Sequence, residues 1–235
     1  VNSPLRPQVV VAILSLIAAC SAVAYAGTSP QEIKEFQEQK TAAEAGIPHS
    51  QYRLGLCYER GIGVAKDPVQ AVAWYRKSAE QGDADGQGAL AQICFEGPES
   101  VKNEAEGVFW YRKFAEQGDR GAQFMLGLAY EHGAGVSKDL VQSAKWLEKS
   151  AKQGHATAQQ MLGCNYLLSE GASRNFIEGY AYLLLATVQD DAMARRLLRS
   201  VTNRMSADEV AAGQQRCREL QKEIEANIAA KKSGK

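Results

Sequence analysis

The chain repeats itself every 36 residues, with no insertion or deletion across four consecutive blocks. Trp74, Trp110 and Trp146 are each separated by this interval. Self-similarity at a fixed period of this length predicts a solenoid, in which each unit buries its apolar face against its neighbours. The repeat therefore constrains the architecture more than any other feature, and it indicates a chain that presents an extended surface to a partner.

A glycine opens each block, and the blocks are residues 46–81, 82–117, 118–153 and 154–189. The first block reads GIPHSQYRLGLCYERGIGVAKDPVQAVAWYRKSAEQ, and the third reads GDRGAQFMLGLAYEHGAGVSKDLVQSAKWLEKSAKQ. The fourth block diverges most and carries Tyr182 in the tryptophan position. Such divergence is expected of a terminal repeat, because one of its faces does not meet a neighbouring repeat.

Each block predicts two helices. The first helix runs through residues 51–59 and ends at Gly61 or its equivalents, Gly97 and Gly133. A small residue recurs at one position of the first helix, where we expect two helix backbones to approach closely. The residues at this position are Gly55, Ala91, Gly127 and Gly163.

The second helix of each block follows a residue that favours the N-cap position, namely Asp67, Asn103, Asp139 or Asn175. It continues with apolar residues at helical spacing and stops at the glycine that opens the next block. No segment alternates with a period of two, so the sequence predicts an all-α fold with about ten or eleven helices and no sheet.

The stretches 54–82 and 126–154, LGLCYERGIGVAKDPVQAVAWYRKSAEQG and LGLAYEHGAGVSKDLVQSAKWLEKSAKQG, resemble the Sel-one-like repeat, a relative of the tetratricopeptide repeat. The tetratricopeptide period is about 34 residues, and the longer G-x-G-V-x-x-D loop accounts for the two extra residues. The resemblance covers residues 46–189. It implies a right-handed α-solenoid with helical caps that binds other proteins, as adaptors do in envelope assembly, secretion, signalling or motility.

The first 26 residues are typical of a secretory signal peptide. Arg6 precedes an apolar run over residues 9–19, and Ala24-Tyr25-Ala26 forms an A-x-A cleavage site. The overlapping segment Ile17-Ala18-Ala19-Cys20-Ser21 also resembles a bacterial lipobox, whose signal would end at residue 19 and leave Cys20 lipidated. The sequence leaves open a periplasmic product that begins at Gly27, a lipoprotein anchored through Cys20, and an uncleaved anchor.

Helical caps are expected on both sides of the four blocks. Residues 27–45 predict one amphipathic helix in phase with the second helix of a repeat. Residues 190–235 predict two further helices and a short tail, and Ser206 and Glu209 form a capping-box pattern before the second of them.

The charge composition argues against binding to nucleic acid or anionic lipid, and the cysteines suggest no disulfide framework. The chain has 27 basic and 27 acidic residues, without the clustered basic footprint that nucleic acid or anionic lipid requires. Cys57, Cys94 and Cys164 all fall on first helices, and we interpret them as small buried apolar residues without an obvious disulfide partner. A bridge that involves Cys217 is left open.

No catalytic or metal-binding pattern stands out. His49, His132 and His155 lack metal-ligand spacing, and the chain has no G-x-S-x-G, H-E-x-x-H or P-loop sequence. We therefore predict no catalytic residue, no metal and no cofactor. The tryptophans occupy a fixed phase, which favours packing between repeats over carbohydrate stacking.

We interpret the chain as an exported, non-catalytic scaffold that binds protein partners in the bacterial envelope. A binder of peptidoglycan or polysaccharide is the alternative. A third reading comes from a cysteine-rich branch of the resembled family that is linked to β-lactam hydrolysis; that branch carries a cysteine on each helix of a repeat, and this chain has none on its second helices.

The first helices of a solenoid line its concave wall, where an extended ligand can contact several repeats. Polar residues on these helices, which mostly vary between blocks, are the candidates for partner binding. They are Gln51, Arg53, Gln87, Gln92, Gln123, Gln159, Gln160 and Asn165.

Overall fold

The computed structural model describes residues 29–168, 175–188 and 192–233, and within these ranges the chain forms eleven helices and no strand. The prediction of an all-α fold is therefore confirmed. The chain divides into two compact units, Val1–Asn103 and Glu104–Lys235, and each is described by itself. The predicted signal segment and Cys20 lie outside the described residues.

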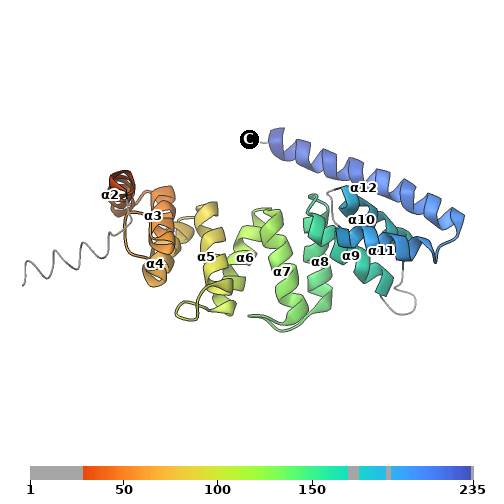
Figure 1. The fold of residues 1–235 in the computed structure, drawn as a ribbon, viewed down its shortest axis with the longest axis horizontal. Coiled ribbons are helices and arrows are strands. Elements are labelled where there is room, and N and C mark those ends of the chain that lie inside the picture. The colour runs from red at the N-terminus through yellow and green to blue at the C-terminus, as the bar shows by residue number, and fades with distance from the viewer. Residues whose placement is uncertain (1–28, 169–174, 189–191, 234–235) are drawn as a thin grey trace, which may run out of the picture. The chain divides into compact units, whose positions relative to one another are not determined.

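The first unit consists of a capping helix and three repeat helices, each in contact with the next along the chain (Figure 1). The capping helix begins with a capping box, in which Ser29 and Glu32 each accept a hydrogen bond from the other's backbone N–H. The first helices of two successive repeats, α3 and α5, also contact each other. The helices are α2 (Pro30–Glu44), α3 (Pro48–Arg60), α4 (Pro68–Glu80) and α5 (Ala84–Glu96).

The second unit continues the alternation of first and second helices and then adds two helices. Its helices are α6 (Glu104–Glu116), α7 (Arg120–His132), α8 (Leu140–Ala151), α9 (Ala156–Leu168), α10 (Phe176–Val188), α11 (Ala192–Thr202) and α12 (Ala207–Ser233). Both α11 and α12 contact α10.

Glycines and caps set the boundaries of the repeat helices. The four glycines that open the blocks have φ values between 78° and 90°, a conformation that costs glycine little. Asp67 and Asp139 each accept hydrogen bonds from two backbone N–H groups of the helix that follows. Asn175 accepts one from the N–H of Glu178 at 3.0 Å. These three predicted N-caps are confirmed.

The recurrent small residue of the first helix makes room for the second helix of the same repeat. A Cβ atom at Gly127 would lie 2.9 Å from Cδ2 of Leu147, and one at Gly163 would lie 2.9 Å from Cγ of Leu183. The two helix backbones approach as expected at Gly163, where an added Cβ atom would also lie 3.0 Å from the carbonyl oxygen of Gly179, whereas the nearest atoms at Gly127 belong to an apolar side chain. The position therefore serves packing, and a larger residue would displace a buried leucine.

Two of the three tryptophans are partly covered by lysines from their own helices. Trp146 is 8% exposed, whereas Trp74 and Trp110 are half-buried. The ammonium groups of Lys77 and Lys149 lie 3.8 and 3.9 Å from the ring centroids of Trp74 and Trp146. Each lysine follows its tryptophan by three residues on the same helix face, so a cation–π contact covers part of the ring that the core leaves exposed.

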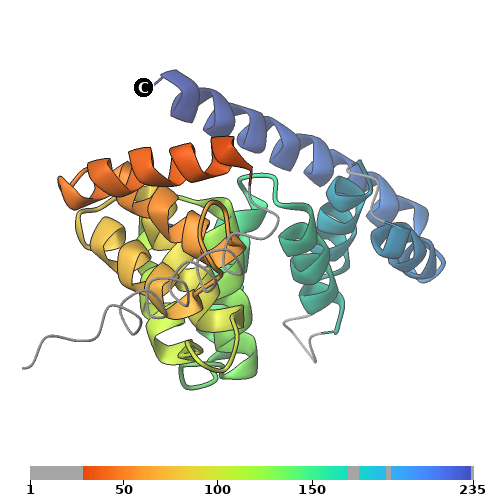
Figure 2. The ribbon, with the colours of Figure 1, turned by 60° about the vertical axis from the view of Figure 1, so that its left-hand side comes forward.

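Helix α10 is mostly apolar and buried, because α9, α11 and α12 all pack against it. In Figure 2, α12 runs along α10, and Cys217, Leu220 and Ile224 join the core formed with α8, α9 and α10. A Cβ atom at Gly213 would lie 2.6 Å from the ring of Tyr180, so glycine lets α12 come close. Helix α12 therefore covers the end of the last repeat.

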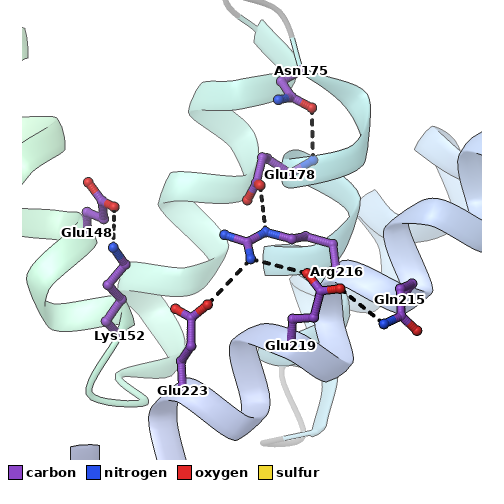
Figure 3. A network of polar contacts seen from close by, with 8 residues as sticks. All are labelled: Glu148, Lys152, Asn175, Glu178, Gln215, Arg216, Glu219 and Glu223. Atoms are coloured by element: carbon purple, nitrogen blue, oxygen red, sulfur yellow. Dashed lines mark hydrogen bonds and ion pairs between the residues drawn. The ribbon is translucent and has the colours of Figure 1, made fainter.

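A charged network fixes α12 on α10 (Figure 3). Nε of Arg216 donates a hydrogen bond of 2.7 Å to Glu178, and Nη1 of Arg216 lies 3.4 and 3.5 Å from carboxylate oxygens of Glu219 and Glu223. Because Arg216 and Glu178 are both less than one-third exposed, this pair is shielded from solvent more than an ordinary surface ion pair.

No described helix is both long and apolar enough to cross a membrane.

Candidate functional site

A cleft in the first unit lies between the first repeat and the first helix of the second. Its volume is about 200 Å³. One wall is the end of α3 with the loop that leads into α4, and the other is the last turn of α5 and the loop after it. The lining residues are Glu59, Lys66, Pro68, Gln92, Ile93, Glu96, Gly97 and Pro98.

Buried packing holds Glu59 in the first wall. The hydroxyl group of Tyr75 donates a hydrogen bond of 2.5 Å to Oε2 of Glu59, and Tyr75 is fully buried. The ring fits there because residue 55 is glycine; a Cβ atom at Gly55 would lie 2.5 Å from Cδ1 of Tyr75. Burial and the bond to Glu59 raise the pKa of Tyr75 far above its ordinary value, so the phenol stays neutral and donates to the carboxylate.

The second wall takes its shape from the end of α5. Gly97 has φ −71° and ψ −179°, which is extended rather than the left-handed conformation of Gly61 and Gly133. The difference follows from Pro98, because a proline disfavours helical geometry in the residue before it. The extended step brings Pro98 into the cleft lining beside Ile93.

The polar lining combines two carboxylates, one amide and one ammonium group. The side chains of Glu96, Gln92 and Lys66 are exposed, and none of these side chains makes a hydrogen bond or an ion pair within the described ranges. Formal charges of −1 on Glu59 and Glu96 and +1 on Lys66 give the lining a net charge of −1. Polar groups of this kind can bind a ligand without first breaking contacts within the protein.

Four of the eight residues predicted to bind a partner are buried and bond to the backbone, so the expectation that they lie on an open surface is corrected. The side-chain amide of each donates to the carbonyl oxygen eight residues earlier, at distances between 3.1 and 3.4 Å. They are Gln51, Gln87, Gln123 and Gln159, with Ala43, Ala79, Ala115 and Ala151 as acceptors. All four occupy the same position of the repeat, which marks a structural role.

The other four predicted residues are at least partly exposed, and partner binding by them stays a prediction. Gln92 lines the cleft. Arg53, on the same unit, donates a hydrogen bond of 2.6 Å to Glu35. Gln160 and Asn165 lie on α9 of the second unit. The structure therefore brings Arg53 and Gln92 into one unit and leaves the other two in the second.

The sequence analysis missed Glu59, Lys66 and Glu96 as lining residues. Only the stacking of α3 and α5 brings them together, and no spacing in the sequence shows that. One signal was available, because the loop after the first helix of the second block departs from the repeat pattern and introduces Pro98.

A second polar group lies at the other end of the same two helices. His49, Asp83 and Asp85 each place a potential ligand atom within 4.8 Å of the others. Asp83 already caps α5 by accepting a hydrogen bond of 2.7 Å from the N–H of Gly86, and His49 and Asp85 are exposed. Exposed acidic groups often gather without a metal, so this geometry alone assigns no metal centre.

The cysteines of the described residues form no disulfide bond with one another. Cys57, Cys94 and Cys217 are buried, and Cys164 is half-buried. Burial raises the pKa of the Cys57 and Cys217 thiols, which disfavours the reactive thiolate. The bridge left open for Cys217 is therefore not formed within this part of the chain.

Comparison with known families identifies the repeated unit. The Sel1 repeat matches the chain four times, at residues 48–83, 84–119, 121–155 and 156–191. A crystal structure of a Sel1 repeat protein from Oxalobacter formigenes is similar over 80% of this chain and 79% of its own, with 30% identity and a TM-score of 0.63. The protective antigen c5321 of uropathogenic Escherichia coli, which displays an SLR fold, is similar over 83% of this chain and 50% of its own, with 29% identity and a TM-score of 0.52.

Two curated eukaryotic proteins share shorter stretches. DAP3-binding cell death enhancer 1 of Rattus norvegicus is 40% identical over 52 residues, which is 22% of this chain. Chitin synthase regulatory factor 3 of Schizosaccharomyces pombe is 36% identical over 64 residues, or 27% of this chain. The chain spans a tenth or less of the length of these two relatives.

Proposed function

Because the chain belongs to the Sel1 repeat family, we propose that it is an exported scaffold that binds a protein partner in the bacterial envelope. The α-solenoid of paired helices is the architecture with which repeat proteins present extended binding surfaces. The observation that carries the proposal is the cleft between the first two repeats. It offers free polar groups on a rigid, buried support, with Glu59 held by Tyr75.

The proposed activity is binding and not catalysis. The most regular polar residues of the repeats are the glutamines represented by Gln51 and Gln123, and their amides bond to backbone carbonyl oxygens. Such side chains stabilise the fold and carry no reactive group. The variable residues that remain exposed, such as Arg53 and Gln92, are of the types that make hydrogen bonds with a partner.

Export rests on the sequence of the first 26 residues, with the apolar run over residues 9–19 and the site Ala24-Tyr25-Ala26. We place the mature chain in the periplasm, with lipidation of Cys20 as the alternative mode of export. An envelope location makes another envelope protein the natural class of partner.

Co-purification from intact cells tests this function. A tagged chain should retain one envelope protein in a fixed ratio, and Arg53→Glu with Gln92→Lys should abolish retention. Loss of the exposed ion pair between Arg53 and Glu35 should lower the thermal midpoint only slightly, so the chain stays folded. The matched control is Lys145→Glu, which changes an exposed side chain on the second helix α8. Retention that survives the first pair of changes but is lost in the control would place the contact on the second helices and contradict the proposed surface.

A further inference from the structure

The cleft lies where two helices end, at the last turn of α3 and the last turn of α5. The C-terminal end of a helix carries a partial negative charge of about half an elementary charge. Glu59 and Glu96 add two carboxylates on opposite walls at the same place, against the single ammonium group of Lys66. The N-terminal end of α4 at Pro68 and the ammonium group of Lys66 oppose this charge, but the C-terminal ends of α3 and α5 and the two carboxylates outweigh them, so the cleft favours a positively charged group.

The size of the cleft restricts what it can hold. Its volume of about 200 Å³ is below the range of about 300–1,000 Å³ that is typical of sites for whole small molecules. A single long side chain fits this space better than a helix or a cofactor. Three apolar residues, Pro68, Ile93 and Pro98, line it together with the polar groups. A side chain with an apolar stem and a charged end matches this mixed lining.

We propose that the cleft binds an arginine side chain of an extended segment in the partner protein. A guanidinium group has five N–H donors in one plane, so it can donate to Glu59, Glu96 and the amide oxygen of Gln92 together. The carboxylate of Glu59 accepts one hydrogen bond from Tyr75, and each carboxylate has about four acceptor positions, which leaves room for further donors. The inference rests on the proposed function, since it names the partner chemistry of the same cleft.

A direct test uses the purified full chain and the peptide acetyl-Gly-Arg-Gly-amide, followed by amide chemical shifts. The peptide should shift the signals of Gln92, Ile93 and Glu96, and added salt should weaken binding because part of the attraction is electrostatic. Acetyl-Gly-Glu-Gly-amide should leave these signals unchanged. Equal shifts with both peptides, or shifts confined to other residues, would overturn the proposal.

Single substitutions show which charged residues determine binding of the arginine peptide. Glu96→Gln should weaken binding of the arginine peptide about fivefold, which is the upper end for a solvent-exposed ion pair. Glu59→Gln should weaken binding more than Glu96→Gln does, although the new amide oxygen at residue 59 can still accept the hydrogen bond from Tyr75. Lys66→Gln should strengthen binding, since it removes the opposing charge. Glu80→Gln removes an exposed carboxylate of α4 outside the cleft and should change nothing. Binding that is unaffected by Glu96→Gln and Glu59→Gln would refute the assignment.

The co-purification and the peptide-binding experiment distinguish failure of the scaffold proposal from failure of the arginine proposal. If the arginine peptide binds in the cleft but no envelope protein co-purifies, the cleft chemistry stands and the cellular role is wrong. If a partner co-purifies and depends on Arg53 and Gln92 while the peptide does not bind, the scaffold role stands and the arginine assignment is wrong.

Discussion

The side-chain amide of Gln123 donates a hydrogen bond of 3.1 Å to the carbonyl oxygen of Ala115, eight residues earlier in the chain. Ala115 lies near the end of α6 and Gln123 in the first turn of α7, so one side chain ties the two helices across the turn that joins them. Gln153 in turn donates to Oε1 of Gln123 at 2.6 Å. The carbonyl oxygen of Ala115 also accepts a hydrogen bond of 3.0 Å from the N–H of Gly118, so the buried glutamine adds a second donor at the end of the second helix.

Replacing Gln123 should destabilise the fold. Gln123→Ala removes one of the two donors to the carbonyl oxygen of Ala115, which keeps the hydrogen bond of 3.0 Å from the N–H of Gly118. The loss should cost about 0.5–1.5 kcal/mol in the free energy of unfolding. Gln160→Ala, at a partly exposed position of α9, should change it by less than about 0.5 kcal/mol. Chemical denaturation of both variants provides the measurement. Equal effects would contradict a structural role specific to Gln123.

An added methyl group at residue 55 should disturb the core. In Gly55→Ala, the new Cβ atom would clash with the buried ring of Tyr75. We expect a loss of about 1–3 kcal/mol from overpacking, although alanine in a helix is otherwise better than glycine by about 0.5–1 kcal/mol. Gly121→Ala on α7 meets only an aspartate oxygen at 3.2 Å and should be neutral or stabilising. Thermal denaturation distinguishes the two, and a stabilised Gly55→Ala would show that the ring can move aside.

Acid should weaken the fourth repeat through His155. Nδ1 of His155 accepts a hydrogen bond of 3.3 Å from the N–H of Ala158 at the start of α9, and only a neutral imidazole can accept there. Burial and then the charge of Arg120 lower the pKa of His155 below its ordinary value of 6.5, against the opposite effect of Asp119. The unfolded chain then binds a proton more readily than the folded one. This stabilisation is complete above pH 6.5 and is lost as the pH falls through the lowered pKa.

The thermal midpoint measured from pH 7.5 to 5 tests the role of His155. His155→Asn keeps a side chain that can cap α9 but does not titrate, so its midpoint should fall less than that of the native chain over this range. The stacking of His155 on Phe124 at 4.5 Å is lost in the variant, which lowers the midpoint at every pH and leaves the slope as the observable. Identical slopes would show that other groups cause any acid sensitivity.

Removal of an N-cap should affect stability and not binding. Asp139→Ala loses both acceptor contacts to the N–H groups of Val141 and Gln142 and should cost about 0.5–2 kcal/mol. Asp139→Asn retains an acceptor oxygen and should cost less. The unfolding free energy and the co-purification of a partner are measured on the same variants. Loss of the partner with unchanged stability would make this loop a recognition element.

The mature N-terminus decides the mode of export. Mass spectrometry of the chain isolated from native cells should find a product that begins at Gly27. A diacylglycerol group on Cys20 would instead identify a lipoprotein. A full-length chain in the cytoplasm would contradict both forms of export.

The local features of the fold could be read from the sequence because each depends on residues close together in the chain. Asp67, Asp139 and Asn175 act as the predicted N-caps, and the capping box of Ser206 and Glu209 is present. These interactions span three residues or fewer. The glycine at 97 occupies its predicted place, but its conformation depends on the proline that follows, which the repeat pattern did not include.

The candidate site could be predicted only in part, because burial depends on contacts between helices. Gln51 and Gln92 look alike in the sequence, yet one is buried against a backbone carbonyl and the other lines the cleft. The constancy of glutamine at the position of Gln51, through all four blocks, was the sign of a structural role. The pairing of Glu59 with Glu96 across the cleft arises from stacked repeats and leaves no trace in local spacing.

The packing of the C-terminal helices against α10 limits where further repeats can be added to the array. Repeat arrays lengthen when one unit is duplicated, and a new copy must find an open face of the same kind on both sides. The last second helix offers no such face, since Ala194 and Val201 of α11 already share a buried core with α10 and Arg216 holds α12 to Glu178. New copies therefore cannot be added directly after α10, and a duplication inside the array in whole units of 36 residues would lengthen the binding surface while the C-terminal helices stay the same.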